Sequence, residues 1–441
     1  DLDLIISNTG TVFIQNDIIE DDASTTDIKM GVASNTTAHT LVIDNKSNQN
    51  QNLMAVDNII GVDSDDTTIV AFRSSGASTA DNTTSFTGVL GGASNAVISQ
   101  IKVGDVDGQD VLVDYGGTAV TVGSIVLGNG GATADTVKLT IDGDANADLV
   151  IAGSINGNTI DTTNLAIGGD DGNTTTFNTD IGLTAALTNV TMGIEDAVDT
   201  TNVFKGSLKA STITVGNTTA TNADVYVLTF NNAAAETVTG VVSEARAADT
   251  TTINISETSG DNAAALAVTF DNTVSLDTFQ IGAANAGGNA IFSDVVTATG
   301  IITVDGGDNS AEISKINFGA DVNAELNLDK NTADAVVTYS GAAATTHTGV
   351  IHAVTADDGK IIISNTVGTT FASTVGTGGA VGEIEVSATG IAIFNTLVDT
   401  TLLDLAGTMT VNENASVTDD IRMAATAVLN IEKTVTNGEV V

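Results

Sequence analysis

One stretch of the chain carries oxygen-bearing side chains at every second position, Asp142-Gly143-Asp144-Ala145-Asn146-Ala147-Asp148. Carboxylate and amide oxygens spaced in this way along a loop are the ligands that Ca²⁺ prefers. A second acidic cluster contains Asp105, Asp107 and Asp110. The pattern predicts calcium sites whose ligands are Asp142, Asp144, Asn146 and Asp148 in the first cluster and Asp105, Asp107 and Asp110 in the second.

The first cluster begins like an EF-hand calcium loop and then departs from that pattern. Ala147 stands where the turn glycine belongs, and Gly153 stands where a bidentate glutamate would complete the ligand set. A complete EF-hand is therefore excluded, while a simpler loop site remains. The alternative for each cluster is a solvated β-turn, in which Asp is used because its side chain bonds to nearby backbone.

Other reactive side chains are scarce. The chain has no cysteine, which excludes disulfides, thiolate catalysis and Cys-based metal centres. His39 is isolated, and we interpret His347 and His352 as surface polar residues rather than as a metal-binding pair. Some β-helices cleave polysaccharides with paired acids, but their grooves also use basic and aromatic residues, which are sparse here. We therefore expect no enzymatic activity.

Short β-strands must position these residues, because the apolar runs are brief, β-branched and bounded by Asn, Asp, Gly, Ser and Thr. Helical periodicity is weak throughout. The runs that predict strands most clearly are Leu2–Ile6, Thr11–Ile14, Leu41–Ile43, Thr68–Phe72, Val111–Val113, Val120–Leu127, Val137–Ile141, Leu149–Ile151, Val225–Phe230, Thr251–Ile255, Ala267–Phe270, Ile301–Val304, Lys360–Ser364, Ile384–Val386 and Thr408–Val411.

The absence of proline from all 441 residues favours continuous backbone pairing, since proline lacks the amide donor that a β-ladder needs. We expect an all-β protein, an elongated parallel β-helix (β-solenoid) with coils of roughly 22 residues around a narrow aliphatic core. Asn and Thr ladders are expected at its corners. Residues 1–130 are less regular and form a β-rich N-terminal region or cap, and residues 131–441 form the solenoid repeats. Tandem β-sandwich domains are the alternative, although their usual Trp and Pro residues are missing.

An inexact repeat supports the solenoid. Thr-Gly followed by two apolar residues recurs at Thr239, Thr299, Thr348 and Thr389, at separations of 60, 49 and 41 residues. These separations are roughly multiples of one coil, so the Thr-Gly steps are expected to mark equivalent coil positions.

The net charge of −42 restricts the partners of the chain. Nucleic acid is excluded as a partner, because its recognition depends on Lys and Arg. The surplus of carboxylates instead requires cations, with Ca²⁺ as the expected bound ion; a halophile's acidic surface is a competing explanation. No run of about 18 apolar residues predicts a transmembrane helix. The chain begins at Asp1 without a signal region, as expected of a mature form or a fragment.

Asn-Thr-Thr runs at Asn35, Asn82, Asn173 and Asn217, together with Thr-Gly-Ile steps and Asp-Gly turns, resemble large surface proteins of Gram-negative bacteria. These families are the passenger regions of autotransporter adhesins, such as rickettsial outer-membrane protein B, and repeat-rich surface-layer proteins. The resemblance implies an extracellular protein at the bacterial cell surface that self-assembles into a layer or filament. Its partners would be copies of itself, with glycans of the cell envelope or host surface as further partners. An adhesin or phage-fibre stalk and a polysaccharide-cleaving enzyme are the alternative functions.

Overall fold

A computed structural model of the chain describes residues 4–7, 9–15, 27–31, 38–45, 51–52, 58–63, 66–75, 83–91, 97–142, 148–169, 173–195, 198–218, 221–231, 234–256, 267–283, 286–308, 312–432 and 439–440. This part of the chain is all-β and contains no helix. Its parallel strands stack as a β-solenoid, which confirms the predicted fold class.

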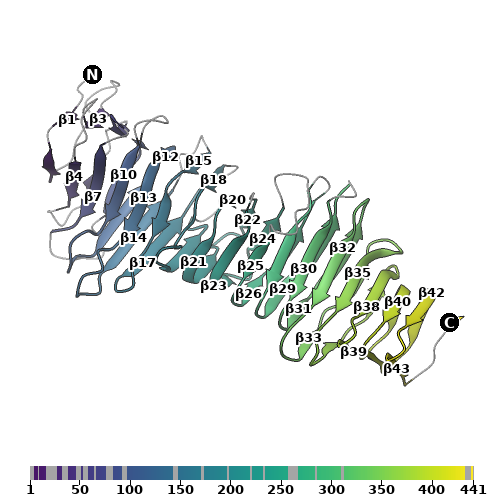
Figure 1. Cartoon of the computed structure of the whole chain (residues 1–441). Coiled ribbons are helices and arrows are strands. Elements are labelled where there is room, and N and C mark those ends of the chain that lie inside the picture. The colour runs from purple at the N-terminus through teal and green to yellow at the C-terminus, as the bar shows by residue number, and fades with distance from the viewer. Residues whose placement is uncertain are drawn as a thin grey trace. The chain divides into compact units, whose positions relative to one another are not determined.

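The chain divides into two compact units. Unit 1 contains residues 1–226 and 245–249, and unit 2 contains residues 227–244 and 250–441. Within each unit, strands of successive coils lie side by side with the same direction (Figure 1). The boundary at residue 130 that the sequence suggested remains a prediction.

The strands of unit 1 are β1 (Leu4–Ile6), β2 (Gly10–Ile14), β3 (Asp27–Met30), β4 (Ala38–Asp44), β5 (Gln51–Asn52), β6 (Asn58–Gly61), β7 (Thr67–Arg73), β8 (Thr83–Phe86), β9 (Val89–Leu90), β10 (Ile98–Val103), β11 (Val111–Tyr115), β12 (Ala119–Val120), β13 (Val122–Leu127), β14 (Thr136–Ile141), β15 (Leu149–Ile151), β16 (Ser154–Asn156), β17 (Thr162–Ile167), β18 (Thr174–Phe177), β19 (Leu187–Met192), β20 (Thr200–Phe204) and β21 (Leu208–Val215). The division between the units falls within β22 (Val225–Phe230).

The strands of unit 2 are β23 (Glu236–Glu244), β24 (Thr250–Ile255), β25 (Val268–Phe270), β26 (Val274–Leu276), β27 (Thr278–Ile281), β28 (Asn289–Phe292), β29 (Val296–Gly306), β30 (Ser314–Phe318), β31 (Val322–Lys330), β32 (Ala335–Tyr339), β33 (Thr345–His347), β34 (Ile351–Ala353), β35 (Asp358–Ile363), β36 (Thr369–Phe371), β37 (Val375–Thr377), β38 (Val381–Val386), β39 (Ile391–Phe394), β40 (Val398–Leu405), β41 (Thr408–Val411), β42 (Ala415–Met423), β43 (Val428–Ile431) and β44 (Glu439–Val440).

Unit 1 has three ladders of strands, and consecutive strands along the chain belong to different ladders. The first contains β3, β6, β9, β12, β15 and β18, the second β4, β7, β10, β13 and β16, and the third β8, β11, β14, β17, β19 and β21. Each coil therefore turns three corners, where polar and glycine residues gather because those corners need turn conformations.

The coils are longer than the expected 22 residues. In unit 1, Leu112 pairs with Lys138 and Lys138 with Asn164, a repeat of 26 residues. In unit 2, Ile302 pairs with Leu326, 24 residues later. Three short strands and three corners use more residues than the sequence estimate allowed.

The core of each unit follows the alternation of strand side chains, which places every second residue inside. Aliphatic residues dominate it, as predicted, but aromatic rings also form stacks that the sequence analysis missed. Phe270, Phe292, Phe318 and Tyr339 occupy equivalent positions on successive coils. The first two rings lie 4.9 Å apart and are nearly parallel. Parallel in-register strands stack identical side chains, so rare aromatic residues contact one another and add stabilisation.

The Thr-Gly steps mark equivalent positions only in part. Gly300 and Gly349 both lie at the corner where Ala324 lies in the coil between them. Gly240 and Gly390 belong to two other corners. The repeat in the sequence therefore reflects the shared need for turn residues at all three corners.

Polar ladders are present, although the clearest one lies on the outer face of strands rather than at a corner. Asn164, Asn189 and Thr212 are in register on β17, β19 and β21. Asn189 Nδ2 donates to Asn164 Oδ1 over 2.8 Å, and Thr212 Oγ1 donates to Asn189 Oδ1 over 2.7 Å. These bonds join three successive coils of unit 1.

Candidate functional site

The second predicted calcium cluster is occupied by partners from within the protein. Asp105 forms an ion pair with Arg73, whose Nη2 lies 2.6 Å from Asp105 Oδ2. Asp107 accepts the backbone N–H of Thr133 over 2.9 Å, and Asp110 accepts that of Thr136 over 2.7 Å. The three carboxylates therefore bond to different groups rather than converging on one point.

The first predicted cluster is only partly visible. Asp144 and Asn146 lie outside the described residues. Asp148 precedes β15, and its Oδ1 accepts the backbone N–H of Thr174 over 2.9 Å. Asp142 follows β14 and lines an open depression, described below. Both residues remain predicted calcium ligands.

Acceptance of a backbone N–H from the neighbouring coil is a general use of aspartate in this protein. The donor lies about one coil away along the chain, from 25 to 27 residues, and the oxygen-to-nitrogen distances are 2.7–2.9 Å; further pairs of this kind are Asp180 with Ser207, Asp199 with Val225 and Asp321 with Thr346. We call these carboxylates coil-linking aspartates. A charged acceptor makes a stronger hydrogen bond than a neutral one, so the bonds tie each coil to the next near its corners.

Asp161 is the most extensively bonded of these carboxylates. It is buried, and it accepts the backbone N–H groups of Asn129, Gly130 and Asp135 over 3.0, 3.3 and 3.1 Å and the Asn158 Nδ2 over 2.8 Å. Burial raises the pKa of Asp161, but these hydrogen bonds outweigh it and hold the pKa below its ordinary value. Asp161 therefore carries its charge inside the fold as a structural acceptor.

The sequence reasoning missed this role, although a signal was available. Asp110 and Thr136 are 26 residues apart, as are Asp148 and Thr174 and Asp199 and Val225. An aspartate that recurs one coil before a strand start is a pattern that the sequence contains. Without the coil length, that spacing could not be distinguished from the general abundance of Asp.

An open depression of about 310 Å³ on unit 1 is the clearest surface feature near the predicted residues. Its charged residues are Asp114, Lys138, Asp142 and Glu195, and its other lining residues are Thr83, Leu112, Val113, Thr140 and Ile194. Strands β8, β11 and β14 supply its floor, and residues that follow β14 and β19 supply Asp142, Ile194 and Glu195.

Glycine permits this arrangement. A Cβ atom on Gly168 would lie 2.6 Å from Asp142 Oδ1 and 3.4 Å from Ile194 Cγ1, so a larger residue would displace both. Burial raises the pKa of Asp114, and the neighbouring Lys138 opposes that shift. The depression offers several carboxylate acceptors and one ammonium donor, a set that can bind hydroxyl or amine groups.

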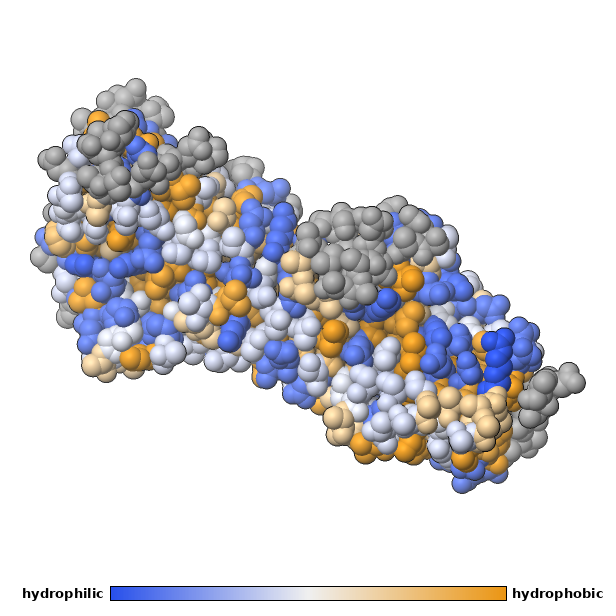
Figure 2. Space-filling view, in the orientation of Figure 1, coloured by the Kyte–Doolittle hydropathy of each residue, from blue (hydrophilic) through white to orange (hydrophobic). Residues whose placement is uncertain are grey.

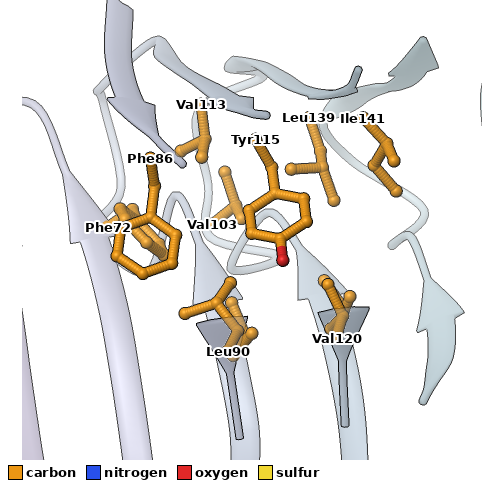
Figure 3. A pocket seen from close by; sticks show the side chains of 11 residues that line it. Phe72, Phe86, Leu90, Val103, Val113, Tyr115, Val120, Leu139 and Ile141 are labelled. Atoms are coloured by element: carbon orange, nitrogen blue, oxygen red, sulfur yellow. The ribbon is translucent and has the colours of Figure 1, made fainter. Parts of the chain in front are cut away.

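A second space in unit 1 is internal and apolar. It is lined by side chains from several ladders, with Leu90 and Val120 facing Phe86 and Tyr115 (Figure 3). About 20 Å³ is open in it, roughly the room for one water molecule, and no polar surface lines it. The Tyr115 hydroxyl already donates to the Ala119 carbonyl over 2.7 Å. This space is a packing gap rather than a ligand site.

The interpretation of His347 as a surface residue was wrong, because its side chain is completely buried in unit 2. Its Nδ1 lies 2.8 Å from the Tyr339 hydroxyl, and its ring neighbours Phe371. Burial lowers the pKa of His347 to about 4, and the backbone carbonyl of Ala324 opposes that shift. His352 lies at the surface, as interpreted, with its Nε2 3.7 Å from Glu325. His39 is buried in unit 1, 3.7 Å from Asp66.

Among the described residues, no group of three or more His, Cys, Asp or Glu side chains is arranged to hold a metal ion. In the same part of the chain, no helix is long and apolar enough to cross a membrane. Hydrophilic and apolar residues are interspersed over the face shown in Figure 2. No protein-family model, curated protein or solved structure matches the chain. The function must therefore be argued from the geometry alone.

Proposed function

We propose that this protein is an extracellular structural component of a bacterial surface, and that its copies assemble through the open edges of its solenoid. The observation that supports the proposal is the edge of unit 2 formed by β43. This strand pairs with β41, and no described strand pairs with its other side. An unpaired strand edge presents free N–H and C=O groups and is a template for pairing with another chain.

The side chains at this edge support the same proposal. Leu429 and Ile431 are in register with Met409 and Val411 of the preceding coil, which are fully buried. Leu429 and Ile431 themselves remain partly exposed, since the described residues place no further coil over them. A second copy stacked on β43 would extend the apolar core and remove this exposure.

Cations would assist assembly rather than fill a site within one copy. Each copy carries a net charge of −42, so two copies repel each other strongly at low salt. Ca²⁺ held between carboxylates of adjacent copies would offset that repulsion, which retains the predicted calcium requirement as part of this proposal.

Negative-stain electron microscopy of the purified chain, with and without calcium, tests the proposal. We expect ordered filaments or sheets with calcium, and their dissolution by a chelator. Leu429→Lys should prevent assembly because it places a charge at the edge, whereas Val367→Lys should not, since Val367 is exposed away from that edge. A chain that stays monomeric in saturating calcium, or that assembles equally well with Leu429→Lys, would refute it.

A further inference from the structure

Unit 2 carries an open depression of about 300 Å³ that the proposed assembly does not use. It lies over the neighbouring strands β35, β38 and β40, which are paired in register. Asp358 pairs with Val381, and Val381 pairs with Thr400. The residues that follow, Gly359, Gly382 and Thr401, therefore form one row across three coils.

The backbone of this row is left bare for steric reasons. Gly359 has a φ of +70°, and a Cβ on it would lie 2.7 Å from the Cβ of Leu328. A Cβ on Gly382 would lie 2.5 Å from the backbone oxygen of Asp357. Because neither position accepts a side chain without displacement, the floor of the depression is fixed by the fold.

Side chains of both charges form the walls. Lys330 Nζ lies 3.2 Å from Asp334 Oδ1, and Lys360 Nζ lies 3.1 Å from Glu383 Oε1. Asp357 is the only described residue other than glycine with a positive φ, 72°, and it accepts a hydrogen bond from the Thr401 hydroxyl. Two of the 13 basic residues of the chain thus lie in this one depression.

Donors and acceptors that alternate around the walls limit the chemistry of a ligand. A metal ion would use the carboxylates but not the ammonium groups, and an anion would be repelled by the excess of carboxylates. Hydroxyl groups both donate and accept, so they can bond to carboxylates and ammonium groups side by side. The volume falls at the lower end of that of small-molecule sites.

We propose that this depression binds one or two rings of a neutral polysaccharide. Carboxylates of Asp357 and Glu383 would accept from sugar hydroxyls, and Lys330 would donate to a ring or hydroxyl oxygen. No aromatic side chain lines the depression, so stacking on a ring is absent and the dissociation constant for one site should be weak, on the order of 1 mM. Assembly of many copies would raise the apparent affinity through avidity.

Native affinity electrophoresis tests the proposal, because polysaccharide cast in the gel retards a protein that binds it. The probes are dextran, xylan, galactomannan and laminarin as neutral polymers, and alginate as an acidic one. The proposal predicts that at least one neutral polymer retards the wild-type chain several-fold. It also predicts that the double variant Lys330→Gln/Glu383→Gln abolishes the retardation, since the paired change leaves the net charge unaltered.

Two further variants locate the binding. Thr401→Tyr fills the depression while leaving every wall charge in place, and it should abolish retardation. Lys138→Gln alters the depression of unit 1 and should have no effect. Equal melting midpoints will show that the variants are folded. The proposal is overturned if no neutral polymer retards the wild type, if only alginate does, if retardation persists in Thr401→Tyr, or if Lys138→Gln abolishes it.

Discussion

Mild acid should destabilise unit 2 through one buried side chain, His347. The ring is completely enclosed between Tyr339 and Phe371, and burial lowers its pKa to about 4. The unfolded chain takes up the same proton near its ordinary pKa of about 6.5. Between these two values the unfolded state binds more protons than the folded state, so stability falls as the pH is lowered.

The size of the effect follows from the two pKa values. A difference of about 2.5 pH units corresponds to about 3 kcal/mol of unfolding free energy. His347 therefore imposes no penalty above pH 6.5, an increasing penalty as the pH falls toward 4, and a constant penalty of about 3 kcal/mol below pH 4. Such a loss is a large part of the stability of an ordinary domain.

Urea unfolding at several pH values, compared between the wild type and His347→Phe, measures this term. His347 is in register with Phe371, which stacks on Phe394 at 4.6 Å, so phenylalanine extends an existing stack. The difference in unfolding free energy between variant and wild type should shift in favour of the variant by about 3 kcal/mol between pH 7.5 and 4. Carboxylates titrate in both proteins and largely cancel in the comparison.

The surface residue His352 provides the control, because His352→Gln removes a histidine without changing the core. Its pH profile should parallel that of the wild type between pH 7.5 and 4. If His347→Phe also parallels the wild type, then His347 is not held neutral by burial and the description of this core is wrong.

Three other substitutions test the packing and the coil-linking bonds. Asp161→Asn should cost about 3 kcal/mol at pH 7 in urea unfolding; because the pKa of Asp161 is lowered, this cost should shrink as the pH falls below about 4, and Asp308→Asn at an exposed position should cost almost nothing. Phe371→Ala should cost about 3–5 kcal/mol by opening the aromatic stack, and a loss below 1 kcal/mol would contradict that stack. Gly168→Ala should lower the melting midpoint by several degrees because its Cβ meets Asp142, and an unchanged midpoint would show that the loop moves freely.

The strands and their class were predictable because they depend on local rules. Runs such as Val137–Ile141 and Thr408–Val411 alternate β-branched and polar residues between turn signals, and both are strands in the structure. The absence of proline made long parallel ladders possible. These features need no knowledge of which coil lies beside which.

The partners of individual side chains were not predictable, since they depend on the coil length. Asp110 was a candidate calcium ligand because carboxylates lie close to it in the sequence, yet its described partner is Thr136 on the next coil. His347 looked like a surface residue because its neighbours in the sequence are small and polar. Its burial follows from the inward direction of its position in the ladder shared with Phe371.

Hydrogen exchange at backbone amides tests most directly the central claim that aspartates join successive coils. Thr133, Thr136 and Thr174 donate their N–H groups to Asp107, Asp110 and Asp148. The account predicts that these three amides exchange as slowly as those of the adjacent strands at neutral pH, and that Asp110→Asn accelerates exchange at Thr136 while leaving Thr174 unchanged. Exchange at all three as fast as in an unstructured peptide would contradict it.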